Sequence, residues 1–421
     1  MPSATVAGSC VCCSVRLTTG LMKKGLKVNL TQEVALPQVA RHLDSVGFSD
    51  IVQIRNKVMS LRAAGKPVYG FHGGEPDFET PQQIKDAMAR ALQENKTRYA
   101  PSSGIDPLRE AIAKKLRRFN AMDVTAEDVL ITVGGIQGLT AAFEAALDPG
   151  DDILVFSPYW TPVGDIIAMA GARAVLVSVE EFDSQGITPV LESYLTPKTK
   201  AIYYNTPANP SGHVFNLQDA EQVAAFALAY NLTVIADEAY EDIVYADGGH
   251  ISIATLPHMA ERTITCFTLS KSYAMTGWRI GYVVAPSRFM QSLQKVILYT
   301  TNGVSTPTQW AALAAFEIGH EFFAEKRDLY RKRRDVLVAG LNELGLHGEL
   351  PGGSFYHFPR VDTINTDSRN VANLLLEHAS IATIPGSVFG VHGEGHIRFG
   401  FAVPMQTIEQ GLEALRKFLA Q

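Results

Sequence analysis

Seven short apolar runs between residues 129 and 285 alternate with helical segments and turn-rich loops, and this pattern limits the possible folds more than any other feature. Short buried strands that alternate with helices are typical of a mostly parallel sheet with helices on its faces. We therefore expect an α/β fold. The runs are residues 129–133, 153–156, 174–179, 200–204, 232–236, 263–267 and 280–285.

The remaining periodic segments predict helices that precede and follow this region. Thr80-Pro81 is a good helix start signal. A run of basic residues at 331–334 is flanked by acids, so we expect it to form a solvated helix face. The predicted helices cover residues 80–92, 105–119, 139–147, a charged segment from about 317, and 407–419.

The composition excludes several classes of protein. The chain has 421 residues and a formal net charge of −6, which favours neither a nucleic-acid binder nor a disordered chain. The longest apolar candidate for a membrane span, residues 129–147, contains Gln137, Thr140 and Glu144. We expect a soluble globular protein with no membrane role, long enough for two or three domains or for one large α/β domain with a smaller companion.

The four cysteines indicate neither a metal centre nor a disulfide framework. Cys10, Cys12 and Cys13 stand together near the N-terminus, whereas Cys266 lies in a predicted strand. A metal site would need a second pair of ligands, which the sequence does not offer. We expect a reducing compartment, the cytoplasm.

Residues 1–32 contain four basic residues, several Ser and Thr, and no acid. This composition is compatible with an organelle transit peptide, and equally with a true start at Met22. Both interpretations stay open.

Polar residues that could carry chemistry stand where apolar runs end. Lys271 and Arg279 lie in the turn between the last two runs, and an activated lysine there suits a Schiff base, although an ordinary loop lysine would look the same. Asp237 directly follows a run, so it is either a buried carboxylate that needs a partner or a helix N-cap. Gly134 and Gly135 form a predicted turn that opens a helix and offers an anion site.

The chain resembles the class I/II aminotransferases, which are fold type I enzymes that use pyridoxal 5′-phosphate (PLP). The resemblance extends from about residue 40 to the C-terminus, and its motifs follow one another in the family's order. The matching residues are Gly74-Glu-Pro-Asp-Phe78, Tyr99, Gly104, Leu108-Arg109, Gly134-Gly135, Pro158-Tyr-Trp160, Asn209-Pro-Ser-Gly212, Asp237-Glu-Ala-Tyr240, Ser270-Lys271, Arg279 and Arg398.

The resemblance implies a role for each matching residue. Lys271 would form the Schiff base and move a proton, Asp237 would keep the pyridine nitrogen protonated, and Tyr240 would complete the catalytic set. Arg398 would bind the substrate's α-carboxylate. Further substrate contacts would come from Gly74, Trp160 and Asn209. The cofactor would be held by Gly135, Ile136, Trp160, Asn209, Asp237, Tyr240, Thr268, Ser270, Lys271, Arg279 and, from the neighbouring subunit of a homodimer, Tyr99.

The resemblance also implies a domain organisation. Residues 79–315 would form a large PLP-binding domain with a mostly parallel sheet. Residues 36–78 and 316–421 would form a smaller α+β domain. Residues 1–35 would be an N-terminal extension.

The implied reaction is a ping-pong transfer of the amino group between an L-amino acid and a 2-oxo acid, with aspartate or an aromatic amino acid as donor. Ile136 stands where some members carry lysine, which weakens the case for a strict dicarboxylate preference. The alternative is a PLP-dependent C–S β-lyase. A PLP-binding regulator is disfavoured because no helix-turn-helix pattern is present, and an NAD enzyme because the Gly-x-Gly-x-x-Gly fingerprint is missing.

Overall fold

The computed structural model describes residues 43–44, 46–47, 50–246 and 248–420. The chain divides into Met1–Ser45 and Val46–Gln421, and the fold below is that of the second unit. The predictions for residues 1–35, including the three N-terminal cysteines, lie outside the described residues.

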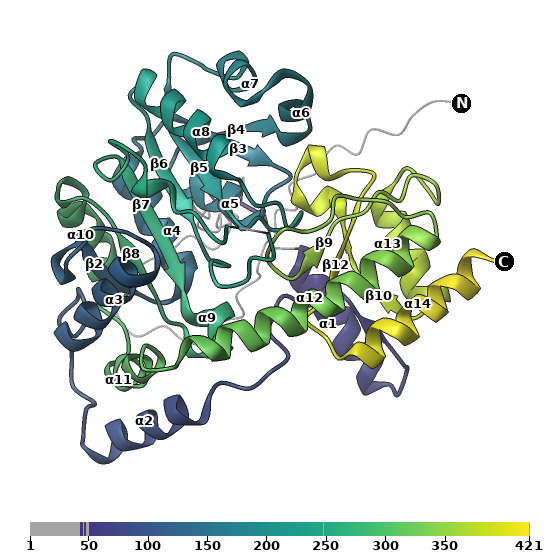
Figure 1. Cartoon of the computed structure of the whole chain (residues 1–421), viewed down its shortest axis with the longest axis horizontal. Helices are drawn as coiled ribbons and strands as arrows, with labels where there is room; N and C mark the ends of the chain where they lie inside the picture. Colours follow the sequence, from purple (N-terminus) through teal and green to yellow (C-terminus); the bar gives the residue numbers. More distant parts are fainter. Residues whose placement is uncertain (1–42, 45, 48–49, 247, 421) are drawn as a thin grey trace, which may run out of the picture. The chain divides into compact units, whose positions relative to one another are not determined.

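A seven-stranded sheet forms the centre of this unit, in the order β2-β8-β7-β6-β5-β3-β4 (Figure 1). Only β8 runs antiparallel to its neighbours, so the prediction of a mostly parallel α/β sheet is confirmed. The strands are β2 (Val129–Thr132), β3 (Asp152–Ser157), β4 (Arg173–Ser178), β5 (Thr199–Asn205), β6 (Thr233–Asp237), β7 (Thr263–Thr268) and β8 (Gly281–Val284).

Helices cover both faces of this sheet, which explains why its strands are continuous apolar runs rather than alternating ones. Successive strand residues point to opposite faces: Cys266 packs with Phe143 and Ile167, while its neighbour Phe267 packs on the other side. One face is covered by α4 (Gly134–Ala146), α5 (Pro162–Met169) and α10 (Ser287–Thr301). The other is covered by α3 (Asp106–Phe119), α7 (Ile187–Ser193), α8 (Leu217–Ala229) and α11 (Thr306–Ala315).

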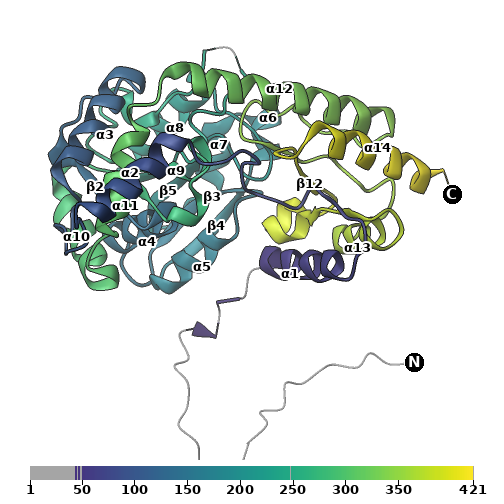
Figure 2. The same ribbon diagram turned by 90° about the horizontal axis from the view of Figure 1, so that it is seen from below.

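The first and last parts of the unit build a second core. The long helix α12 (His320–Glu343) runs between the large sheet and this region, and α1 (Asp50–Ala63) lies beside α13 (Ser368–His378) in Figures 1 and 2. The other elements are α14 (Met405–Leu419) and the short strands β1 (Tyr69–Gly70), β9 (Tyr356–His357), β10 (Ile381–Ala382), β11 (Ile384–Pro385) and β12 (Ile397–Gly400). The proposed domain boundaries at 78/79 and 315/316 stay a prediction.

Two expectations were wrong. Gly134 and Gly135 do not form a turn before a helix, because α4 already begins at Gly134. The basic run at 331–334 is not wholly solvated, because Arg333 is buried and paired with Asp77. The helix predicted at 80–92 is α2 (Gln82–Gln93). None of the helices in the described part of the chain has the length and apolar character needed to cross a membrane.

Candidate active site

Lys271 lies in the one-turn helix α9 (Leu269–Ser272), directly after the C-terminal end of β7. Its Nζ donates a hydrogen bond to the carbonyl oxygen of Gly74 at 2.7 Å and lies 5.8 Å from the centre of the Tyr240 ring. Thr268 begins the turn by accepting a hydrogen bond from the backbone N–H of Ser270. The amine is thus hydrogen-bonded to a neutral carbonyl group, and it can give up this hydrogen bond when a carbonyl compound reacts with it.

Asp237 is the last residue of β6 and is buried. Its carboxylate accepts a hydrogen bond from the Tyr203 hydroxyl at 2.7 Å and from the backbone N–H of Ala239 at 3.2 Å. Burial raises the pKa of Asp237 from 3.8 to about 6, although the two hydrogen bonds and the charge of Lys271 oppose this rise. A cation placed against this carboxylate would therefore be strongly favoured.

The start of α4 faces Arg279 across a very short gap. A Cβ atom at Gly134 would lie 2.6 Å from Nη2 of Arg279, and Gly134 has φ +71°, so only glycine fits. The first N–H groups of a helix have no partner within the helix, and here they belong to residues such as Gly135 and Ile136. No ion pair among the described residues includes Arg279. A guanidinium beside a helix N-terminus is well suited to a phosphate group.

Arg398, on β12, is 2 % exposed. Nη1 donates to Oδ1 of Asn209 and Nη2 to the carbonyl oxygen of His72, each at 3.0 Å, whereas the buried Nε has no partner. The guanidinium lies over the rings of Tyr356 and Phe389. A buried guanidinium held in place by neutral groups is prepared to receive a carboxylate.

Two tyrosines that the sequence analysis did not assign belong to this site. Tyr356 pairs with the Tyr240 hydroxyl at 3.1 Å, and its hydroxyl lies 2.8 Å from the position that a Cβ at Gly74 would take. Tyr203 holds Asp237. The only sequence signal for Tyr356 is its position at the end of the glycine-rich loop 351–356.

Three predicted site residues are less closely tied to the others. Tyr99 is 91 % exposed and Ile136 is 45 % exposed. Trp160 is half-buried and packs at the edge of the cluster around α4 and β3. In the described part of the chain, no hydrogen bond joins the side chain of Tyr99 or Trp160 to another predicted site residue.

The residues present fit PLP. The Arg279 guanidinium, which donates a hydrogen bond to the Thr276 carbonyl oxygen but has no acidic partner among the described residues, and the start of α4 suit its phosphate. The buried Asp237 carboxylate suits its pyridine nitrogen. Lys271 supplies the amine that its aldehyde requires. The fit therefore rests on three separate groups, the Arg279 guanidinium, the Asp237 carboxylate and the Lys271 amine. Each of them suits a different part of PLP.

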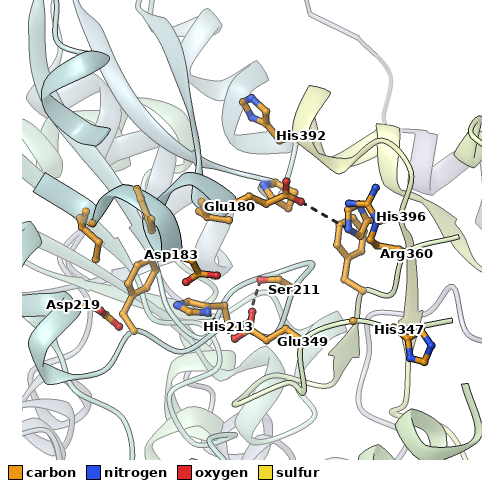
Figure 3. A pocket seen from close by; sticks show the side chains of 18 of the residues that line it. Glu180, Asp183, Ser211, His213, Asp219, His347, Glu349, Arg360, His392 and His396 are labelled. Carbon is orange, nitrogen blue, oxygen red and sulfur yellow. Dashed lines mark hydrogen bonds and ion pairs between the residues drawn. The ribbon is translucent and has the colours of Figure 1, made fainter. Parts of the chain in front are cut away.

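A separate cavity of about 600 Å³ is lined by neither Lys271 nor Arg398. Figure 3 shows the side chains that border it. Two histidine–carboxylate pairs border it: His213 Nδ1 lies 3.0 Å from Glu349 Oε1, and His396 Nε2 lies 4.0 Å from Glu180 Oε1. No group of three or more His, Cys, Asp or Glu among the described residues is arranged to hold a metal ion. Ser211, in the Asn209 loop, Pro158, two residues before Trp160, and His396, two residues before Arg398, all line this cavity.

Residues 66–415 match the family described as aminotransferase class I and II. The aspartate/prephenate aminotransferase of Thermus thermophilus is 37 % identical over 91 % of this chain and 99 % of its own length. The aromatic-amino-acid aminotransferase 2 of Thermococcus litoralis is 36 % identical over 90 % of this chain and 97 % of its own length.

Solved structures agree with these relatives. The aspartate aminotransferase of Thermus thermophilus with maleate superimposes with a TM-score of 0.87 at 36 % identity, over 91 % of this chain and all of that one. The fold and the site define an α/β enzyme of fold type I. The chain belongs to the aminotransferase class I and II family, and it is an aminotransferase. Family membership implies PLP as the cofactor.

Proposed function

We propose that this protein uses PLP to transfer the amino group between an L-amino acid and a 2-oxo acid by a ping-pong mechanism, with aspartate and aromatic amino acids as donors. The observation that carries the proposal is the grouping of Lys271, the buried Asp237 and the buried Arg398 around the paired rings of Tyr240 and Tyr356. The names of the Thermus and Thermococcus relatives support this donor class.

The cofactor would be held at both ends. Arg279, Thr268, Ser270 and the amides of Gly135 and Ile136 would bind the phosphate, since they combine a positive charge with free hydrogen-bond donors. At the other end, Asp237 would keep the pyridine nitrogen protonated, with Tyr203 fixing the orientation of the carboxylate. The ring oxygen and one ring face would be contacted by Tyr240, Asn209 and Trp160.

When bound, PLP supplies the electron sink that makes removal of the proton at the substrate's Cα feasible. Lys271 would take that proton and return it as a general acid. Its Nζ donates a hydrogen bond to the Gly74 carbonyl oxygen, and Arg398 donates one to the carbonyl oxygen of His72, two residues earlier. The segment 72–74 thus holds both the amine and the guanidinium. Positioned acid–base catalysis of this kind contributes about 10²–10⁴-fold.

Arg398 and Asn209 would bind the α-carboxylate, and so fix which bond at Cα is broken. Asn209 already accepts a hydrogen bond from Arg398, so the pair needs little reorganisation when substrate arrives. Gly74 would lie beside the substrate. A side chain at this position would meet the Tyr356 hydroxyl, so glycine lets the backbone approach Tyr356 closely.

We also propose that the active unit is a homodimer in which Tyr99 reaches the phosphate bound by the neighbouring subunit. Its 91 % exposure within one chain supports an intermolecular role. The chain has a mass of 45.8 kDa, and sedimentation analysis should give twice this value. A monomeric active enzyme would contradict this part of the proposal.

The test replaces Lys271 with alanine, with Lys295→Ala as matched control, since Lys295 is exposed on α10. Purified proteins are incubated with PLP, L-aspartate or L-phenylalanine, and 2-oxoglutarate, and glutamate is measured. We expect Lys271→Ala to abolish turnover, and Lys295→Ala to match the wild type. Transamination by Lys271→Ala would refute the role of the lysine. Pyruvate and ammonia from L-cystathionine without transamination would favour a β-lyase.

A further inference from the structure

The separate cavity has two walls that come from different parts of the chain. One wall is formed by side chains of residues 158–222 and the other by side chains of residues 347–396. Its volume of about 600 Å³ is typical of pockets that bind small organic molecules. Figure 3 shows Glu180 and Asp183 on the first wall and His396 on the second. The cavity is therefore bounded on both sides by groups that can bind a ligand.

His396 presents a hydrogen-bond acceptor to this cavity. The residue is only 9 % exposed, and its ring stacks on that of Phe358 with 4.9 Å between the ring centres. Nδ1 lies 3.1 Å from the carbonyl oxygen of Glu394, which can only accept, so Nδ1 carries the hydrogen. Burial lowers the pKa of His396, although the hydrogen bond to Glu394 opposes this change, so the imidazole is neutral at neutral pH. Nε2 is then an acceptor, and no residue in the described part of the chain donates a hydrogen bond to it.

The group that faces Nε2 is an acceptor too. Oε1 of Glu180 lies 4.0 Å from Nε2 of His396, which is too long for a hydrogen bond. A carboxylate and the lone pair of a neutral imidazole do not attract each other. An N–H donor placed between them would satisfy both, and a positively charged donor would do so best.

Two other charged groups of the cavity are already compensated. Arg360 pairs with Asp362 at 3.1 Å. Glu349 lies 3.0 Å from His213. Burial lowers the pKa of His213, but the hydrogen bond to Glu349 and the nearby carboxylates raise it overall. These pairs leave the cavity with no free cation among the described residues that line it.

The remaining charged groups of the cavity are acids. They are Glu180, Asp183 and Asp219. No ion pair among the described residues includes Asp183 or Asp219, although both act on His213 through their charge. The cavity therefore carries an excess of negative charge, which favours a positively charged ligand.

The apolar part of the lining also suits an organic cation. Phe182, Phe215 and Phe358 all line the cavity. Aromatic rings bury the apolar body of a ligand and attract a cation over their faces. A bare metal ion fits less well, because no group of three or more His, Cys, Asp or Glu in the described part of the chain is arranged to hold one.

We propose that this cavity is a binding site for an organic cation that carries N–H donors on an apolar body. The donors would bridge Glu180 and Nε2 of His396, with Asp183 adding negative charge, and the apolar body would lie against the phenylalanine rings. None of these residues has a role in the proposed transamination, so the site is an additional one.

Calorimetry on the PLP-loaded protein tests the proposal with benzylguanidinium and benzylurea. The two probes have nearly the same shape, but only the first is charged, and neither condenses with an aldehyde as a primary amine does. Since hydrogen bonds between charged groups are strong, benzylguanidinium should bind about tenfold more tightly than benzylurea. Equal affinities, or no binding of benzylguanidinium, would overturn the proposal.

Variants locate the binding. Glu180→Gln combined with Asp183→Asn should weaken benzylguanidinium about tenfold and leave benzylurea nearly unchanged. Glu221→Gln is the control, because Glu221 is exposed on α8 beside Gln222 but does not line the cavity. An equal loss in the control would show that only the overall charge matters, which contradicts the proposal.

NMR of the imidazole groups observes His396 directly. Its signal, identified by its loss in His396→Phe, should shift when benzylguanidinium is added and stay in place with benzylurea. An unchanged signal at saturating benzylguanidinium would contradict the proposal. All of these measurements omit amino acids, so they give the same answer whether or not the protein transaminates, and a lack of transamination would contradict only the proposed function.

Discussion

Arg333 holds Asp77 with both terminal nitrogens, each 2.8 Å from a different carboxylate oxygen. The Arg333 side chain is 8 % exposed and that of Asp77 is 20 % exposed. This bidentate pair fastens the segment that follows β1 to the middle of α12. Because the same segment carries Gly74, whose carbonyl oxygen accepts a hydrogen bond from Lys271, the ion pair also helps to fix the position of the Lys271 amine.

We predict that Asp77→Ala lowers the free energy of unfolding by about 3–5 kcal/mol, because it leaves the buried Arg333 without a counter-charge. Urea unfolding measures the change. Asp328→Ala is the control: Asp328 pairs with Arg331 at the surface, where such a pair contributes about 0–1 kcal/mol. Similar losses in the two variants would show that the Arg333 pair is no more important than a surface ion pair.

A second prediction concerns Asp237 in protein freed of PLP. Its pKa of about 6 in the folded protein lies above the ordinary 3.8, so the folded state binds the proton more tightly and loses stability as pH rises between these values. Asp237→Asn cannot ionise. The stability of the variant relative to the wild type should therefore increase from pH 4 to pH 8, by on the order of 3 kcal/mol.

Urea unfolding of both proteins at pH 4, 5, 6, 7 and 8 checks this prediction. If the difference in free energy of unfolding between the two proteins does not change with pH, the pKa of Asp237 is not raised. Saturating PLP should abolish the advantage of the variant at pH 8, because the wild-type carboxylate then faces a cation. At that pH, Asp237→Asn should also bind PLP more weakly.

The sequence predicted the central sheet well because its strands are buried on both faces and therefore appear as continuous apolar runs. It did not predict the start of α4. Glycine is a poor helix former, so Gly134, Gly135 and Gly138 indicated a turn. The structure gives the reason for Gly138: a Cβ atom there would lie 2.9 Å from the Val283 side chain, so close packing of the helix on the sheet requires glycine.

The candidate site was predicted from local motifs, and the residues missed are those that depend on distant pairing. Asn205 pairs in register with Asp237, so Tyr203, two residues before Asn205, points to the same face of the sheet as Asp237. Nothing in the sequence distinguishes Tyr203 from Tyr204 without that register. Arg333 is separated from Asp77 by 256 positions, and a basic run in a helix gives no sign of which arginine is buried.

The last prediction concerns His213 and Glu349, which form one of the two histidine–carboxylate pairs at the border of the separate cavity. Burial lowers the pKa of His213, but the hydrogen bond to Glu349 and the carboxylates of Glu349, Asp219 and Asp183 outweigh it, so the pKa is raised overall. Because the folded protein holds the proton more tightly, the pair should stabilise it below the ordinary histidine pKa of about 6.5 and lose this effect as pH rises through the raised pKa.

Glu349→Gln should therefore destabilise the protein at pH 6 and have little effect at pH 9. The Glu349 side chain is 63 % exposed, so the loss should not exceed about 1 kcal/mol. NMR titration of the imidazole should show a lower His213 pKa in the variant, and Glu261→Gln, at an exposed position, is the control. A loss of equal size at both pH values would point to packing of Glu349 rather than to its charge.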